Sequence, residues 1–174
     1  MPKIIENIRE KLLVEAKAQL FDKGYSALTV RSVARACGVG VGTLYNYFPS
    51  KEMLVVTFML EDWQICIRNT EERISVLSSL SDVFLCVYEG IVEFTEKYAE
   101  LFSDTAANKD RGGEVEYHRL LRSQISELLR PVCMANVSAP SEFFIDFISE
   151  ALVTWTVEGH PFDEINSMLC KLFN

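Results

Sequence analysis

The chain has 174 residues, 49% of them hydrophobic and 24% charged, with a net charge of −8 at neutral pH. This composition supplies a folded core and excludes a disordered chain, and no apolar run approaches the roughly 20 residues of a membrane-spanning helix. The first residues lack the pattern of a secretory signal, and the five cysteines and two histidines are scattered. We therefore expect a folded cytoplasmic protein with no membrane partner, no bound metal and no cofactor.

Three helices are predicted in the N-terminal part. Apolar residues recur at three-and-four spacing from Ile5 to Leu20, and Gly24 is a plausible stop for this first helix. Thr29 can cap a second helix that ends at Cys37-Gly38. After a short turn, a third helix covers residues 42–48.

The rest of the chain also reads as helix. Residues 51–75 and 80–101 are apolar on more than one side, as in helices buried among neighbours. A polar, glycine-bearing connection at 103–113 precedes a helix at 114–130, and two helices with wide apolar stripes follow. Because no stretch shows strand-like alternation and no segment repeats, we predict an all-α fold in two parts.

The charge is unevenly distributed between these parts. The first 51 residues carry eight Lys and Arg against four Asp and Glu, a net +4, so the remainder carries −12. A basic end on an acidic body is typical of a protein that binds nucleic acid through that end, because phosphate neutralisation contributes much of the affinity.

Residues 29–52 read as two short helices across a glycine turn. Thr43, Asn46 and Tyr47 share one face of the second helix by their spacing, and this polar and aromatic face suits base edges and phosphates. The positions able to pack the pair against the first helix are Val33, Val39, Leu44 and Phe48. Spacing alone leaves open a purely structural helical hairpin.

The segment resembles the DNA-binding signature of the TetR family, with a Thr-capped helix, a Gly-Val turn and a Thr-Leu-Tyr-x-x-Phe helix followed by Ser-Lys-Glu. The resemblance covers about the first third of the chain. It implies a three-helix helix-turn-helix DNA-binding domain at residues 1–50 and a helical bundle at 51–174 for dimerisation and effector binding. It also implies a homodimeric repressor that binds a palindromic operator in double-stranded DNA and is released by a small-molecule effector. The aromatic residues of the middle helices, described below, indicate that this effector is small and largely apolar.

The resemblance assigns roles to individual residues. Arg31 and Thr43 look like readers of base edges, and Lys51 looks like a phosphate ligand. In the turn, Gly40-Val41 replace the Ser-Lys of many members, so a capping hydroxyl and a positive charge are lost and Val41 is free to contact a thymine methyl. The predicted DNA-binding set is Thr29, Arg31, Val41, Gly42, Thr43, Tyr45, Asn46, Tyr47 and Lys51.

The two C-terminal stripes predict a four-helix contact between two copies of the chain. Intrachain core is the commoner fate of apolar helix faces and remains the alternative. Two-fold symmetry would place two reading helices at half-sites about 34 Å apart. The predicted interface set is Phe144, Phe147, Ile148, Ala151, Leu152, Trp155, Ile165, Met168, Leu169 and Leu172.

Aromatic residues in the middle helices predict an effector pocket, although aromatics at helical spacing are usually core. The predicted lining set is Phe58, Trp63, Ile67, Phe84, Tyr88, Ile91, Phe94 and Tyr117. No nucleophile or metal ligands accompany His118 or His160, so we predict a protein that is not an enzyme. One alternative is a regulator, either a repressor or an activator, that is controlled by a protein partner and has no small-molecule pocket. Another is an all-helical enzyme or scaffold that uses the helix pair only structurally.

Overall fold

The computed structural model describes residues 7–101, 114–137 and 140–173. Every regular element in these ranges is a helix, which confirms the predicted all-α fold. The predicted connection at 103–113 lies outside the described residues. Within the described part, no helix combines the length and the apolar character needed to cross a membrane.

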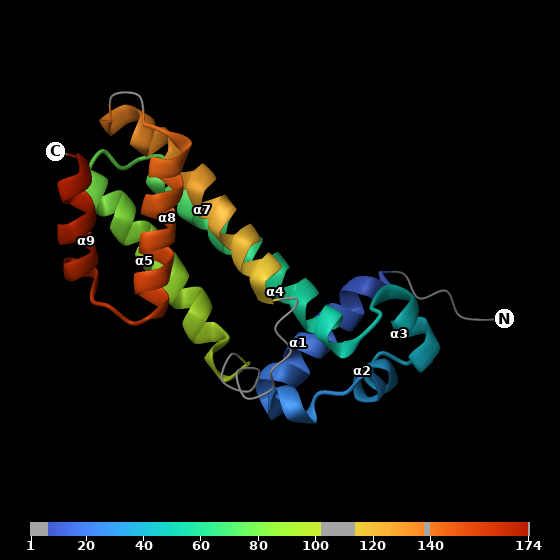
Figure 1. Ribbon diagram of the computed structural model, residues 1–174. Coiled ribbons are helices and arrows are strands. Elements are labelled where there is room, and N and C mark those ends of the chain that lie inside the picture. Colours follow the sequence, from blue (N-terminus) through green and yellow to red (C-terminus); the bar gives the residue numbers. More distant parts are fainter. Residues whose placement is uncertain (1–6, 102–113, 138–139, 174) are drawn as a thin grey trace. The chain divides into compact units, whose positions relative to one another are not determined.

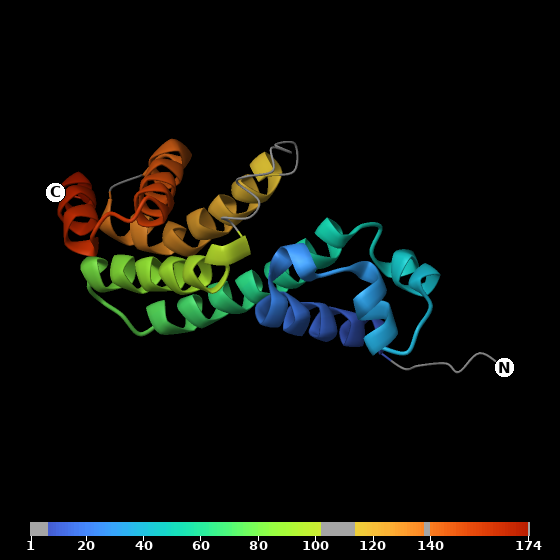
Figure 2. The same cartoon turned by 90° about the horizontal axis from the view of Figure 1, so that it is seen from below.

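The described residues divide into two compact units. The first comprises residues 7–62 with 100 and 101, and the second comprises residues 63–99 with 114–173, apart from the gap at 138–139. The fourth helix, α4 (Lys51–Ile74), contributes residues to both. Figures 1 and 2 show the elements of each unit from two directions.

The first unit contains α1 (Ile8–Ala27), α2 (Val30–Ala36), α3 (Val41–Tyr47) and the first half of α4. Its core contains the apolar side chains of the helix faces that the sequence predicts to point inward. These side chains are fully or almost fully buried. These core residues are Leu12, Ala16, Leu20, Val33, Ala34, Leu44, Phe48 and Leu54.

The helix ends in this unit follow local sequence signals. Thr29 and Ser32 form a capping box at the start of α2, as the sequence predicts for Thr29. Ser50 Oγ accepts from the amide of Met53 at 3.1 Å and so caps α4. Gly24 interrupts α1 with φ 77° and ψ 167°, a conformation that is essentially restricted to glycine.

The second unit contains the rest of α4 with α5 (Leu80–Lys97), α7 (Glu114–Asn136), α8 (Glu142–Val157), α9 (Phe162–Cys170) and the short η1 (Lys171–Phe173). Helix α8 packs against α5, α7 and α9, and α9 also packs against α5 (Figure 1). The buried residues that join these helices are Phe84, Val87, Ile125, Leu129, Ile145, Ile148, Leu152, Ile165 and Leu169.

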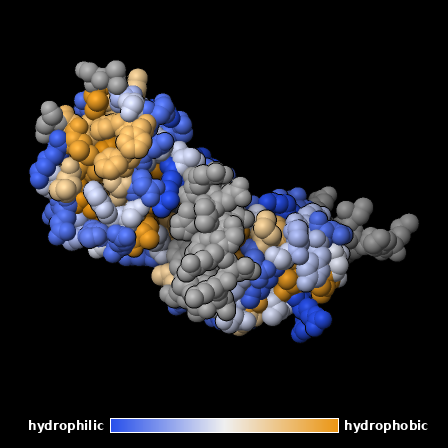
Figure 3. Space-filling model, in the orientation of Figure 1, coloured by the Kyte–Doolittle hydropathy of each residue, from blue (hydrophilic) through white to orange (hydrophobic). Residues whose placement is uncertain are grey.

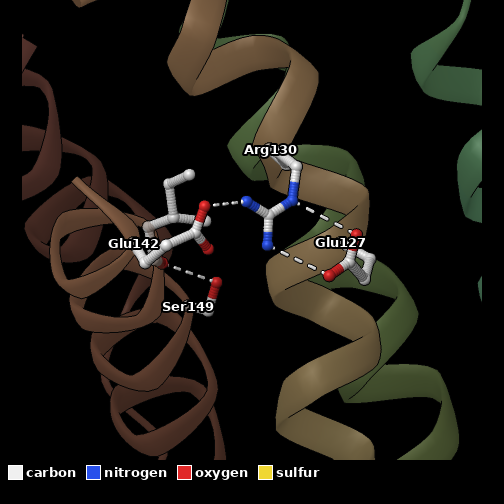
Figure 4. Close-up of polar contacts among 5 residues, drawn as sticks. Glu127, Arg130, Glu142 and Ser149 are labelled. Atoms are coloured by element: carbon white, nitrogen blue, oxygen red, sulfur yellow. Dashed lines mark hydrogen bonds and ion pairs between the residues drawn. The ribbon is translucent and has the colours of Figure 1, made fainter. Parts of the chain in front are cut away.

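An arginine joins α7 to the start of α8. Arg130 donates to both carboxylate oxygens of Glu127 at 3.0 and 3.2 Å and to Glu142 at 2.5 Å (Figure 4). In α8 itself, the Ser149 hydroxyl donates to the backbone carbonyl of Ile145. The hydrogen bond from Arg130 lowers the pKa of the Glu142 carboxyl. Glu142 lies in the first turn of α8, where its charge also complements the helix dipole.

Helices α4 and α5 approach each other closely at a glycine. A Cβ atom placed on Gly90 would lie 2.8 Å from Thr70 Oγ1 and 3.3 Å from Cys66 Sγ. Cys66 Sγ lies 3.3 Å from the carbonyl oxygen of Gly90, and Thr70 is buried. The crossing therefore depends on the absence of a side chain at residue 90.

Candidate nucleic-acid interface

Helices α2 and α3 are joined by a tight turn. Gly38 adopts φ 69°, the left-handed conformation that glycine favours after a helix. The amide of Gly38 donates to the carbonyl of Arg35 at 3.1 Å, and that of Val39 donates to Ala34 at 2.9 Å. These bonds satisfy the last carbonyls of α2 and fix the direction in which α3 leaves the turn.

The start of α2 is tied to α1 through a polar chain. Thr29 Oγ1 accepts from the Ser32 amide at 3.1 Å, and Ser32 Oγ donates to Gln19 Oε1 at 2.6 Å. Gln19 is buried and donates in turn to Glu15 at 2.7 Å. Sequence reasoning missed Gln19 and Ser32, because their pairing depends on how α1 and α2 pack.

Helix α3 presents two different faces. Leu44 and the following Phe48 are buried, whereas Tyr45 and Tyr47 are 50% and 45% exposed. Asn46 and Gly42 are exposed, and Thr43 and Val41 are half-buried. The N-cap position, Gly40, makes no side-chain hydrogen bond, as expected from the missing serine hydroxyl. The members of the predicted DNA-binding set that lie in α3 are thus accessible to solvent, while Leu44 fixes the helix to the core.

The predicted residues outside α3 are also accessible. Thr29 and Arg31 are exposed at the beginning of α2, and Lys51 is half-buried at the first position of α4. All nine residues of the predicted DNA-binding set lie in the first unit. Their individual contacts with DNA stay predictions.

Lys51 is held by a residue that sequence reasoning missed. Its ammonium donates to the backbone carbonyl of Tyr25 at 2.8 Å and lies 3.8 Å from the centroid of the Tyr25 ring. The Tyr25 hydroxyl donates to Glu52 Oε1 at 3.1 Å. Burial and then the Glu52 charge raise the pKa of Tyr25 to about 12. No sequence signal marks this contact, because residues 25 and 51 meet only when α1 and α4 pack.

Two further pairs fasten α1 to α4. Arg9 contacts Glu61 at 3.1 Å on the surface, and Lys17 contacts Asp62 at 2.5 Å in a more buried position. The Arg9 guanidinium also lies 5.8 Å from the centroid of Phe48, the residue that ends α3. These contacts hold α1 on the first half of α4 and join α1 to the end of α3.

The predicted effector residues are distributed between the units. Phe58 is buried in the first unit, whereas Trp63, Phe84, Ile91 and Phe94 are buried in the second, and Ile67 and Tyr88 are half-buried there. The side chain of Tyr117 lies outside the described residues.

The buried aromatic residues of the second unit contact one another. Trp63 donates to Gln124 at 2.7 Å, and its ring lies 5.0 Å from that of Phe94. Phe94 in turn lies 5.1 Å from Tyr98. These rings are part of the core, and the predicted effector pocket stays a prediction.

The predicted dimer set also separates into two groups. Five members are buried within the second unit, and for these the alternative interpretation, a place in the core of a single chain, applies. They are Ile148, Ala151, Leu152, Ile165 and Leu169. Phe144 and Trp155 are half-buried.

The other members of the dimer set are exposed. Phe147, Met168 and Leu172 expose 46%, 56% and 45% of their surface, and Phe143, which was not predicted, exposes 79%. Figure 3 shows apolar side chains gathered over α8 and α9. We call these four residues, Phe143, Phe147, Met168 and Leu172, the α8–α9 apolar surface.

Comparisons with known proteins converge on one family. Residues 12–57 match the family model described as bacterial regulatory proteins, tetR family. Over 57 residues the chain is 42% identical to the HTH-type transcriptional repressor KstR of Rhodococcus jostii (strain RHA1), covering 32% of this chain and 27% of that one. The alignments with the first four curated relatives span between 18% and 49% of those proteins.

The likeness extends beyond the N-terminal helices. The fold is similar to that of Thermus thermophilus FadR, a transcriptional repressor solved in complex with lauroyl-CoA, with a TM-score of 0.64, 18% identity and 95% and 92% of the two chains covered. Over 152 residues the chain is 30% identical to the HTH-type transcriptional regulator BetI of Rhizobium meliloti (strain 1021), covering 78% of this chain and 72% of that one. The chain therefore belongs to the TetR family of DNA-binding transcriptional regulators.

Proposed function

We propose that this regulator is a homodimeric repressor that binds a palindromic operator and is released by a small, largely apolar effector. The observation that carries the DNA-reading part is the division of α3 into a buried side, Leu44, and an exposed polar and aromatic side, Tyr45, Asn46 and Tyr47. A seven-residue helix anchored on one face and open on the other suits insertion into the major groove.

In this proposal Arg31 and Thr43 read base edges, Val41 contacts a thymine methyl, and Lys51 binds a phosphate. Tyr45, Asn46 and Tyr47 contact phosphates or bases, and Thr29 and Gly42 touch the DNA backbone. We propose residues 1–50 as the DNA-binding domain and 51–174 as the regulatory and dimerisation domain. The first turns of α4 then serve as the support on which the DNA-binding helices are packed.

Selection of bound sequences from random duplex DNA tests the DNA-reading part. The wild-type chain should enrich a palindromic site, and Tyr47→Ala and Lys51→Ala should lose it or bind it weakly. Val14→Ala is a matched control, because Val14 is exposed on α1 and belongs to no proposed contact. Absence of enrichment by the wild-type protein at low salt would contradict the proposal.

The dimer part rests on the α8–α9 apolar surface. Four large apolar side chains exposed on adjacent helices are costly in water and favour association with a second, identical surface. Met168→Glu and Phe147→Glu should convert the dimer to a monomer in analytical ultracentrifugation and weaken operator binding. Val76→Glu is the control, because Val76 is more exposed but lies apart from α8 and α9 in the sequence.

The effector part rests on the aromatic interior of the second unit and on the lauroyl-CoA bound to the similar Thermus thermophilus FadR. The mutual packing of Trp63, Phe94 and Tyr98 favours the second candidate, control by a protein partner. Titration of the protein–operator complex with lauroyl-CoA tests one representative acyl effector. Saturable release supports an apolar effector, and unchanged operator binding excludes lauroyl-CoA as the effector.

A further inference from the structure

Lys51 differs from the other cations that connect α1 and α4. Arg9 and Lys17 each pair with a carboxylate, Glu61 and Asp62. Among the described residues, no carboxylate lies within ion-pair distance of the Lys51 ammonium; its partners are the carbonyl and the ring of Tyr25. These neutral partners orient the charge, and the Glu52 carboxylate acts on it only at longer range than an ion pair.

The donor inventory of the ammonium leaves room for another ligand. A lysine ammonium has three N–H donors. The Tyr25 carbonyl accepts one at 2.8 Å, and the Tyr25 ring face, 3.8 Å away, occupies a second direction. One donor remains on a cation whose flexible side chain is already held in place, which lowers the entropy that a further contact costs.

Tyr25 is itself fixed from both sides. Gly24 breaks the helical path of α1 directly before it, and the amide of Leu28 returns to the Gly24 carbonyl at 3.2 Å. At the far end of the ring, the hydroxyl donates to Glu52 at 3.1 Å. Tyr25 is thus clamped against two successive residues of α4, Lys51 and Glu52.

We propose that Tyr25 is a positioning residue for DNA binding, which holds the Lys51 ammonium, in no direct ion pair among the described residues, ready for one phosphate of the operator backbone. This inference rests on the proposed phosphate contact of Lys51. The aromatic ring and the backbone carbonyl perform the positioning, and the bond to Glu52 holds the ring. Positioning of one phosphate contact changes affinity and its salt dependence, and it leaves the base preference unchanged.

The test measures affinity for the selected operator duplex by fluorescence anisotropy across a salt series. Loss of one phosphate contact reduces the slope of log affinity against log salt by about 0.9. We expect this reduction in Lys51→Ala and part of it in Tyr25→Leu, which removes the ring but keeps the backbone carbonyl. Tyr25→Phe keeps the ring and loses only the hydroxyl bond to Glu52, so its slope should stay closer to the wild-type value than that of Tyr25→Leu. The double variant Tyr25→Leu/Lys51→Ala should bind no more weakly than Lys51→Ala alone.

The outcomes separate the two levels of the proposal. An unchanged slope in Lys51→Ala would show that Lys51 makes no phosphate contact, and the role proposed for Tyr25 would then also be wrong. A reduced slope in Lys51→Ala together with a wild-type slope in Tyr25→Leu overturns only the positioning role. Additional weakening in the double variant, or an altered base preference in Tyr25→Leu, shows that Tyr25 acts independently of Lys51 and also overturns it.

A measurement on the wild-type protein covers the case in which Tyr25→Leu does not fold. Proton NMR should show the Lys51 methylene next to the ammonium shifted upfield by the Tyr25 ring, both free and bound to the operator duplex. Disappearance of the upfield shift on DNA binding would mean that Lys51 leaves Tyr25 to reach the phosphate, and the inference would then be wrong.

Discussion

The Lys17 ammonium and the Asp62 carboxylate lie 2.5 Å apart, and the Asp62 side chain is only 9% exposed. Asp62→Ala removes the nearly buried carboxylate that pairs with the part-buried Lys17 ammonium, so it should lower the free energy of unfolding of the first unit by about 2 kcal/mol. Hydrogen exchange of the α1 amides measures this locally. The exposed partner of Arg9 provides the control, since Glu61→Ala should cost less than about 1 kcal/mol. Equal effects of the two variants would contradict the prediction.

Gly24 should not tolerate a side chain, even though space is available. A Cβ atom there meets nothing within 4 Å, so the cost of Gly24→Ala comes from its φ of 77°. We expect a loss of about 1 to 3 kcal/mol in urea unfolding. Gly42→Ala also meets open space but lies inside α3, so it should raise stability by up to about 1 kcal/mol. A neutral Gly24→Ala would disprove the strained backbone.

Gly90→Ala should destabilise the second unit for a different reason, a steric clash. The new methyl group would lie 2.8 Å from Thr70 Oγ1, and overpacking of this kind costs about 1 to 3 kcal/mol. Thr70→Ala removes the obstructing hydroxyl. The double variant should therefore lose less unfolding free energy than the two single variants lose together, by at least about 0.5 kcal/mol. Thermal unfolding of the four proteins gives the coupling, and additive effects would rule out the clash.

Tyr25 should ionise later than an ordinary tyrosine. Its pKa is raised from 10.0 to about 12, first by burial and then by Glu52, so the folded state favours the neutral phenol. The resulting stabilisation is complete below pH 10, where both states are protonated, and is lost as the pH rises from 10 to about 12.

Phenolate absorbance measures this titration directly. The titration should contain a late component, and Tyr25→Phe should reduce that component by one tyrosine. Glu52→Gln should lower the midpoint without returning it to 10, because burial remains. A late component of unchanged amplitude in Tyr25→Phe would contradict the raised pKa of Tyr25.

The parts of the structure that depend on near neighbours in the chain could be predicted from the sequence. The Thr29 cap, the left-handed Gly38 and the spacing of Val33, Leu44 and Phe48 specify the helix pair within about 20 residues. The Lys17–Asp62 and Lys51–Tyr25 contacts could not be predicted. They join residues 45 and 26 positions apart, and their partners are ordinary charged or aromatic residues until α1 and α4 are packed.

The C-terminal stripes show a second limit. Periodicity identifies the apolar face of a helix but not what covers it. On α8, Ile148 and Leu152 are covered by the chain itself, whereas Phe147 on a neighbouring position remains exposed. Only the arrangement of α5, α7 and α9 distinguishes these cases.

The brevity of α3 has a consequence for genetics. Seven residues without a side-chain cap are too few to remain helical in water, so the helix persists only because Leu44 and Phe48 are packed beneath it. A screen for loss of operator binding should therefore recover substitutions at Leu12 or Ala16 of α1 beside those at Tyr47. The two classes differ in phenotype: core alleles should be temperature-sensitive, whereas surface alleles of α3 should fail at every temperature.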